Sequence, residues 1–299
     1  MTDDTESARL LGIVVPTLGA PEPPEFTAED RRITQVSLAW QRLSTEARWM
    51  EGHAMLAGLP PGTYIELYGR AAATGEQLGL SLASLLDARG WLLRPIEVAH
   101  RALSALASAE VAGYFAYAAA HGLVVVTARA LRIDPSAHRI LQRTKAGQPD
   151  PPRFAPFEPT RQPSMNEEWV GLLRAAADAS GEPAAQALVE PIERLLAAEA
   201  WVAMVGRRDQ NFHRDRPQSL PTGVAFENPW EVDEHGNGVL DFPGEANYVP
   251  PDPDIAVEEA STAVSELASA MSAWIDQLQP TLVALGGTQR FPESEEHGT

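Results

Sequence analysis

Residues 27–57, TAEDRRITQVSLAWQRLSTEARWMEGHAMLA, carry the clearest structural signal in the chain. Thr27 and Asp30 have the spacing of a capping box, in which two side chains satisfy backbone N–H groups at a helix start. Apolar residues then recur three or four positions apart until the stretch GLPPG at 58–62. They are Ile33, Val36, Trp40, Leu43, Ala47, Met50 and Ala54. The pattern predicts one long amphipathic helix.

Helical periodicity continues through the rest of the first half. Residues 63–90 favour a helix that is interrupted near Gly75, and residues 95–120 favour another, with a proline in its first turn. The stretch VVVTARALRI after Gly122 fits either a short strand or a buried helical turn. Pro135 separates it from a further short helical segment.

The second half follows the same pattern. Ser164 and Glu167 suggest a capping box for a helix that ends near residue 180. A long helix is predicted from 184 to about 213, with a kink at Pro191. A last helix is expected from about 255 to 285, bent at Pro280. The predicted fold is therefore all-α.

Proline- and acid-rich segments divide this helical chain. Residues 146–163 hold six prolines and no periodicity, which indicates a linker or strap between two helical halves. The stretch HGNG at 235–238 suggests the turn of a short acidic hairpin. The expected organisation is an irregular segment at 1–26, a helical region at 27–145, the linker at 146–163, a second bundle at 164–287 with an insertion at 218–253, and an acidic tail at 288–299. The first region could be a sensor, a dimerisation module or part of one continuous bundle.

Composition limits the chemistry that the chain can perform. It has 299 residues, no cysteine and a formal net charge of −18, so disulfides, thiolate metal sites and cysteine nucleophiles are excluded. Residues 214–299 hold 16 acidic and 3 basic side chains, which repel nucleic acid, so any RNA site must be local. No basic leader precedes LLGIVV, and no apolar run is long enough to span a bilayer. We therefore expect a cytoplasmic protein without a membrane segment.

The segment RRDQNFHRDRP, residues 207–217, closes the long helix predicted from 184. In it Arg208 is followed by the polar Asp209 and, after three further residues, by His213. This pattern resembles the signature of the HEPN superfamily, helical ribonucleases that act without a metal. The resemblance covers residues 164–287 only. It implies that Arg208 and His213 are the catalytic pair and that Asp209 supports them, in a bacterial toxin–antitoxin or phage-defence protein.

These residue types suit RNA cleavage. Histidine titrates near neutral pH, so His213 can act as general acid or base. The guanidinium of Arg208 offers bidentate donors to a phosphate, and a neighbouring carboxylate would orient the imidazole and raise its pKa. The flanking residues predicted to bind the RNA are Arg207, Gln210 and Arg214. No metal and no cofactor are expected.

Helical geometry separates the motif into two parts. At about 100° per residue, Asp209 and His213 share one face, whereas Arg208 is turned roughly 140° away from His213. The resemblance implies that a homodimer closes this gap by bringing two motifs into one cleft. In the long helix predicted from 184, His213 lies about five full turns beyond Leu195, in line with it and near Val202, so we expect it on an apolar stripe that faces the bundle or a cleft.

Other interpretations stay open. Arg-x(4–6)-His spacings also occur at Arg48/His53, Arg94/His100 and Arg132/His138. Cationic residues in the last turn of a helix also favourably meet its dipole. The alternative to an enzyme is a non-catalytic, acidic helical interaction protein, such as an antitoxin, adaptor or assembly subunit. Its acidic C-terminal third would then contact a basic partner.

Two metal-like patterns are incomplete. Glu97-x-x-His100 is the ligand pair of helical di-iron proteins, but those sites need a second such pair. The segment from Asp233 resembles a calcium loop, but its twelfth position is Gly244 where a bidentate glutamate is needed. A half-buried histidine and an acidic turn explain these patterns instead.

Overall fold

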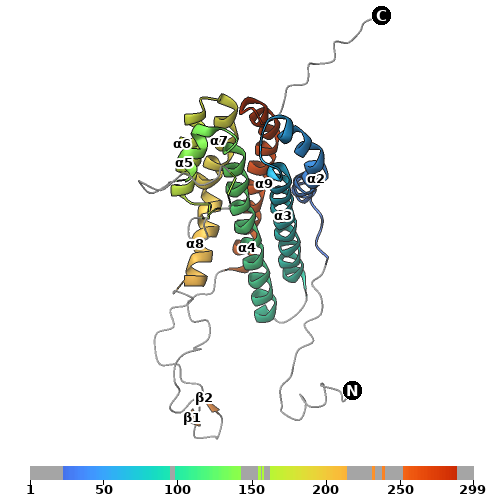
Figure 1. The fold of residues 1–299 in the computed structure, drawn as a ribbon. Coiled ribbons are helices and arrows are strands. Elements are labelled where there is room, and N and C mark those ends of the chain that lie inside the picture. Colours follow the sequence, from blue (N-terminus) through green and yellow to red (C-terminus); the bar gives the residue numbers. More distant parts are fainter. Residues whose placement is uncertain are drawn as a thin grey trace, which may run out of the picture.

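The computed structural model is a helical bundle (Figure 1). It describes residues 23–94, 98–142, 154–155, 157, 162–213, 231–232, 238–239 and 252–287. Within these ranges, the side chains of 98–100, of 208–213 and of the two short strands are not described. The all-α fold predicted from the sequence is confirmed.

The first helix, α2 (Ala28–Leu56), begins where the sequence predicts. The Thr27 hydroxyl accepts from the Asp30 N–H at 3.1 Å, and an Asp30 carboxylate oxygen accepts from the Thr27 N–H at 2.9 Å. The predicted capping box is therefore present. The predicted apolar row is buried along the whole helix, against α3 and α9.

Helix α3 (Thr63–Leu93) runs through Gly75 without a break, so the predicted interruption is wrong. The reason is contact with α2. A Cβ on Gly75 would lie 2.5 Å from Trp40 Cβ and 2.8 Å from the Ser37 carbonyl oxygen, and the Ser37 hydroxyl donates to the Gly75 carbonyl at 2.7 Å. This glycine allows two helices to approach closely.

The start of α3 uses a cap that the sequence does not reveal. Its N-cap residue, Gly62, has a φ of +88° and no side chain to accept a hydrogen bond. The carboxylate of Glu51 on α2 accepts from the N–H groups of Tyr64 at 3.0 Å and Ile65 at 3.2 Å instead. Glu51 thus satisfies helix-end donors and fixes the α2–α3 corner.

The ambiguous stretch after Gly122 is helical. It forms the end of α4 (Val98–Leu131), which packs along α3 and α9. Because its β-branched residues are surrounded by other helices, packing determines their backbone conformation. The short α5 (Pro135–Gln142) follows, and its first residue is the proline that the sequence placed at this boundary.

Helix α6 (Glu167–Ser180) begins at a different cap from the predicted one. The N-cap is Asn166, whose side-chain oxygen accepts from the Trp169 N–H at 2.9 Å. Serine and asparagine are both preferred N-cap residues, so the sequence alone does not distinguish a cap at Ser164 from one at Asn166. The helix ends at Gly181, with φ +71°, as predicted near residue 180.

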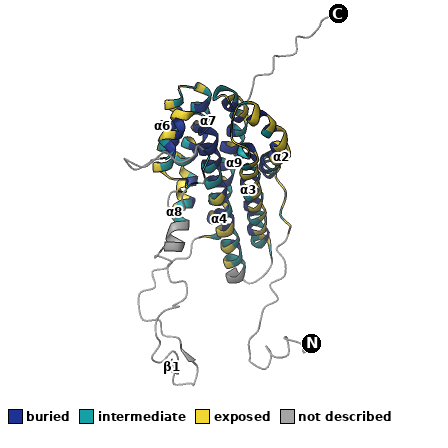
Figure 2. Ribbon diagram, viewed as in Figure 1, coloured by how far each residue is buried: buried dark blue, intermediate teal, exposed yellow. Residues whose placement is uncertain are grey.

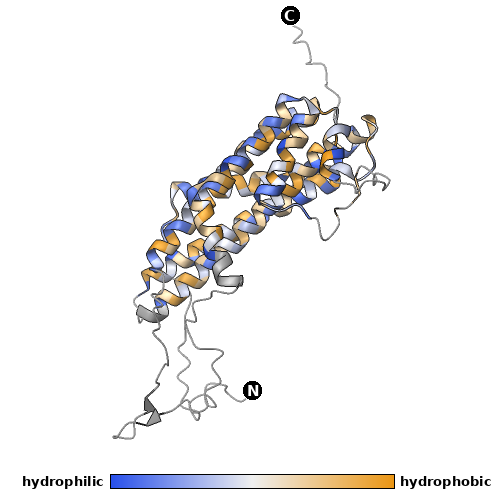
Figure 3. Cartoon of the chain, turned by 90° about the vertical axis from the view of Figure 1, so that its left-hand side faces the viewer, coloured by the Kyte–Doolittle hydropathy of each residue, from blue (hydrophilic) through white to orange (hydrophobic). Residues whose placement is uncertain are grey.

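The last helix, α9 (Pro253–Ala284), is the central element of the bundle. It contacts α2, α3 and α4 from the first half of the chain and α7 (Pro183–Ala197) and α8 (Glu199–His213) from the second. Figure 3 shows the elongated bundle that results. One hydrophobic cluster contains residues from both halves, and Figure 2 shows the buried positions along the facing sides of the helices.

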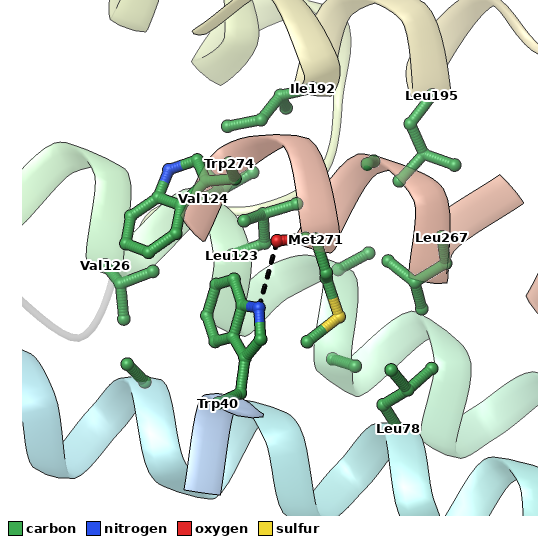
Figure 4. Packing of buried hydrophobic residues seen from close by; sticks show 14 of the residues in the cluster. Trp40, Leu78, Leu123, Val124, Val126, Ile192, Leu195, Leu267, Met271 and Trp274 are labelled. Atoms are coloured by element: carbon green, nitrogen blue, oxygen red, sulfur yellow. Dashed lines mark hydrogen bonds between the residues drawn. The ribbon is translucent and has the colours of Figure 1, made fainter. Parts of the chain in front are cut away.

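Two buried tryptophans join this core (Figure 4). Trp40 on α2 and Trp274 on α9 have ring centroids 4.7 Å apart. The indole N–H of Trp40 donates to the Met271 carbonyl at 3.0 Å, and that of Trp274 donates to the Thr127 hydroxyl at 2.7 Å. Each large apolar ring therefore keeps its polar atom satisfied inside the core.

Two short strands precede α9 in the chain. Strands β1 (Glu231–Val232) and β2 (Gly238–Val239) pair antiparallel, with Glu231 opposite Val239.

In the described residues one helical segment, Arg101–Leu131, is long and apolar enough to cross a membrane. Of its apolar window 56% is buried inside the bundle. That is weak evidence for a span, because a buried core helix passes the same test.

Candidate functional site

The segment that leads to the candidate motif is two helices, α7 and α8, and not the single helix predicted from 184 to 213. The chain breaks at Ala198, whose backbone is extended with φ −71° and ψ 131°. Pro191, where a kink was predicted, lies inside α7. The boundary is therefore set by a residue with no breaking tendency of its own.

Packing explains the break. Leu195 at the end of α7 and Met204 on α8 are both buried. In a continuous helix, nine residues at about 100° each would place these two side chains on opposite faces. The break lets α7 and α8 each turn its own apolar face towards α9, so burial outweighs helix continuity.

The first half of α8 is anchored in the core. Trp201 is buried, and its ring stacks with that of Tyr117 on α4, with centroids 6.4 Å apart and an interplanar angle of 18°. Met204 of α8 lies against Gly113 of α4, and a Cβ added to Gly113 would be 3.6 Å from Met204 Cγ. These contacts fix the rotation of α8, and its last turns lie beyond them (Figure 1).

The predicted catalytic residues occupy those last turns. The backbone of α8 is helical from Glu199 to His213, so Arg208, Asp209 and His213 belong to one helix, with Asp209 and His213 one turn apart. The side chains of these residues and of Gln210 lie outside the described part of the structure, and Arg214 lies outside it altogether. Their convergence into a site remains a prediction.

The predicted helical register between His213 and Leu195 is wrong, because the break at Ala198 interrupts the helix between them. Val202, which was predicted to lie near His213 on the same stripe, has 55% of its surface exposed. The side of α8 that carries Val202 therefore faces solvent at this residue and does not face the bundle.

Arg207 is the one predicted RNA-binding residue whose side chain is described. Its guanidinium forms an ion pair with the carboxylate of Glu259 on α9. Both side chains are about one third exposed, at 31% and 35%. The pair joins α8 and the first turns of α9 across a partly exposed contact and neutralises part of the positive charge at the start of the motif. Glu259 could not be linked to Arg207 from the sequence, because 52 residues separate them.

A second group of charged residues lies at the C-terminal end of α4. Arg129 is buried and its guanidinium is 2.6 Å from the Glu66 carboxylate. Arg132, also buried, donates to the Ala155 carbonyl at 2.8 Å and stacks over the Phe157 ring, with its guanidinium carbon 3.9 Å from the centroid. Burial, followed by the neighbouring Arg129, lowers the pKa of Arg132, and although Glu66 opposes both, the pKa falls to about 10.

These arginines have a structural role that the sequence pattern did not reveal. Arg132 holds Ala155 and Phe157, two residues of the proline-rich segment, against the end of α4. In the sequence it appeared only as one of the Arg-x(4–6)-His spacings. The sequence signal for this role is that Arg132 precedes a proline-rich segment that contains Phe157, because arginine packs favourably on aromatic rings.

The described residues contain no group of three or more histidine and carboxylate side chains that could hold a metal ion. Glu97 and the side chain of His100, which form the predicted half of a di-iron pattern, lie outside the described part, as does the loop from Asp233 to Asn237. No protein-family model, curated protein or solved structure matches the chain.

Proposed function

We propose that the chain is a HEPN-like, metal-independent endoribonuclease whose active residues lie at the end of α8. The observation that carries the proposal is positional. The Arg208-to-His213 motif occupies the last turns of a helix in an all-α bundle, and Asp209 and His213 are one turn apart in uninterrupted helical backbone. Trp201 and Met204 hold the preceding turns in the core, which gives the motif a fixed base.

In the proposed reaction, the 2′-hydroxyl of one nucleotide attacks the adjacent phosphorus. His213 takes the hydroxyl proton and gives a proton to the departing 5′-oxygen, so that no net proton is gained or lost. Arg208 stabilises the negative charge on the phosphorane oxygens, and Asp209 orients the imidazole. The products are a 2′,3′-cyclic phosphate and a free 5′-hydroxyl, so the step needs no metal and no cofactor.

The proposal includes a homodimer and a bacterial setting. Within one helix Arg208 and His213 point about 140° apart, so two copies of α8 are needed to bring an arginine and a histidine to one phosphate. We place the protein in the cytoplasm, as part of a toxin–antitoxin or phage-defence system. An inactive relative would keep the bundle and lose only the cleavage.

The test is cleavage of total RNA in EDTA by wild type, His213→Ala and Arg208→Ala. We expect wild type to cleave and both variants to lose at least about 100-fold in rate, the usual contribution of a general acid or base. Arg194→Ala is the matched control, because Arg194 is an exposed arginine in the last turn of α7. Equal cleavage by all four proteins, or cleavage by none, contradicts the proposal.

Two observations favour the alternative of a non-catalytic interaction protein. Glu259 already pairs with Arg207, and residues 214–299 hold 16 acidic and 3 basic side chains. Both features reduce the attraction of RNA to this end of the molecule. In that case the acidic third binds a basic protein, and wild type and variants are equally inactive on RNA.

A further inference from the structure

The outward side of α2 presents a regular row that no other described element covers. α2 forms one edge of the bundle (Figures 1 and 2) and contacts only α3 and α9 among the described elements. Along its opposite side, exposed residues alternate three and four positions apart for the length of the helix. We call these residues the α2 row: Arg31, Gln35, Leu38, Arg42, Thr45, Trp49, Gly52 and Leu56.

The spacing of the α2 row is that of a helix–helix seam. Positions that alternate by three and four residues stay on one side of a slightly supercoiled helix and can receive the side chains of one partner helix. Three of them are large apolar residues left in water: Leu38 is 44% exposed, Trp49 63% and Leu56 67%. A solvent-facing side of an edge helix does not need such residues for folding.

Gly52 adds an independent observation. It lies in the middle of a helix, where glycine is less favourable than alanine by about 0.5–1 kcal/mol, and a Cβ at this position would meet no atom within 4 Å. The chain's own packing therefore does not require glycine here, in contrast to Gly75. Between Trp49 and Leu56, its missing side chain leaves a hollow in which a partner's side chain can insert.

The charge of this side indicates the chemistry of the occupant. Arg31, Arg42 and Arg48 are exposed, and in the described residues none of them forms an ion pair. Glu46 is the exposed acidic residue on the same stretch. In a chain with a net charge of −18, this local excess of arginine favours an acidic partner.

We propose that the α2 row binds one amphipathic helix of a partner protein, which carries acidic side chains beside its apolar stripe. A second copy of this chain fits less well, because pairing α2 with itself would double the excess of arginine at one interface. RNA also fits less well, because the exposed Leu38 and Leu56 that flank Arg42 and Trp49 along the row offer it neither stacking nor a charge. The site is separate from the α8 motif and does not depend on the proposed ribonuclease activity.

The test uses two synthetic helices of about four heptads with leucine at a and d. One carries glutamate at e and g, and the other carries lysine there. Binding is followed by fluorescence anisotropy of the labelled peptides with full-length protein. We expect the acidic peptide to bind, more weakly at high salt, and the basic peptide not to bind. No binding of the acidic peptide, or equal binding of both, overturns the proposal.

Two pairs of variants locate the site. Arg42→Glu with Arg48→Glu should weaken binding about tenfold or more, while Arg139→Glu with Arg194→Glu, the same change on exposed arginines of α5 and α7, should not. Gly52→Gln should weaken binding several-fold without lowering the melting temperature. Gly171→Gln, at an equally open helical glycine of α6, should leave binding unchanged. Equal effects of a variant and its control overturn the proposal.

Two further outcomes would also overturn it. Sedimentation of the free protein could show a dimer that Trp49→Ala dissociates, in which case the α2 row binds a second copy. A single-stranded RNA could bind the wild type and lose affinity in the Arg42→Glu, Arg48→Glu variant, in which case the row binds nucleic acid. Circular dichroism of every variant checks that the bundle is folded.

Discussion

The α2–α3 pair and the α7–α8 pair are divided at different kinds of residue: the stretch GLPPG at 58–62 lies between the first two helices, and Ala198 lies between the other two. α3 passes Gly75 without interruption because α2 packs directly on it, and α7 continues through Pro191. The chain breaks instead at Ala198, between two apolar faces that a single helix would turn in opposite directions. In this bundle, contacts between helices decide where helices end, and local propensity is secondary.

The largest effect is expected in the tryptophan core. Trp274→Ala removes a fully buried ring and its hydrogen bond to Thr127, so the free energy of unfolding should fall by about 3–5 kcal/mol. Val202→Ala on α8 truncates a side chain that is 55% exposed and should change it by less than about 0.5 kcal/mol. Urea unfolding of both variants checks the contrast. Similar losses would mean that α8 packs more closely than described.

The next effect concerns the start of α2. Asp30 is buried and accepts from Arg89 at 2.8 Å and from Thr27. Burial alone would raise the pKa of Asp30, but the Thr27 hydrogen bonds and Arg89 outweigh it and the pKa is lowered. Asp30→Asn should therefore cost about 2–3 kcal/mol at neutral pH.

The lowered pKa of the Asp30 carboxyl group predicts that the free energy of unfolding depends on pH. Because the folded pKa of Asp30 lies below its unfolded value of about 3.9, its contribution is fully present above that value and is lost as the pH falls through the folded pKa. Wild type should lose stability below about pH 4, and the loss should be smaller in Asp30→Asn. Parallel acid limbs for the two proteins, measured by urea unfolding, would exclude this role.

The same substitution at two glycines should have opposite signs. Gly75→Ala would place its Cβ 2.5 Å from Trp40 Cβ and should destabilise by about 1–3 kcal/mol. Gly206→Ala on α8 meets nothing within 4 Å and should stabilise by about 0.5–1 kcal/mol. Thermal unfolding measures both signs. A neutral Gly75→Ala would show that α2 and α3 are farther apart than described.

The smallest effect is expected at the α8–α9 ion pair. Arg207→Ala removes a contact with Glu259 between side chains that are about one third exposed, so it should cost less than about 1 kcal/mol. The cost should shrink at high salt. A loss above about 2 kcal/mol would indicate that the pair holds α8 in place. Unfolding at low and high ionic strength distinguishes the two cases.

Much of the fold could be predicted from local patterns. The capping box of Thr27 and Asp30 marks the start of α2, and Gly181 marks the end of α6. Features that depend on a distant partner could not be predicted. Glu51 caps α3 across a turn, and Ala198 breaks the chain only because Leu195 and Met204 must both be buried.

The candidate site also combines features that local sequence predicts with features that depend on distant residues. The position of the motif at the end of a helix follows from the apolar spacing and from the prolines after it, and the structure places His213 at the end of α8. The register between His213 and Leu195 was wrong because it assumed an unbroken helix. The ion pair of Arg207 with Glu259 joins residues on both sides of a long insertion, which local sequence does not encode.

The most direct test of the proposed site compares an all-ribose oligonucleotide with its 2′-O-methyl counterpart in EDTA, using wild type and His213→Ala. We predict that wild type cleaves only the ribose strand, leaving a 2′,3′-cyclic phosphate, and that His213→Ala cleaves neither while melting at the same temperature. Cleavage of the 2′-O-methyl strand, or unchanged cleavage by His213→Ala, would contradict the assignment of catalysis to the end of α8.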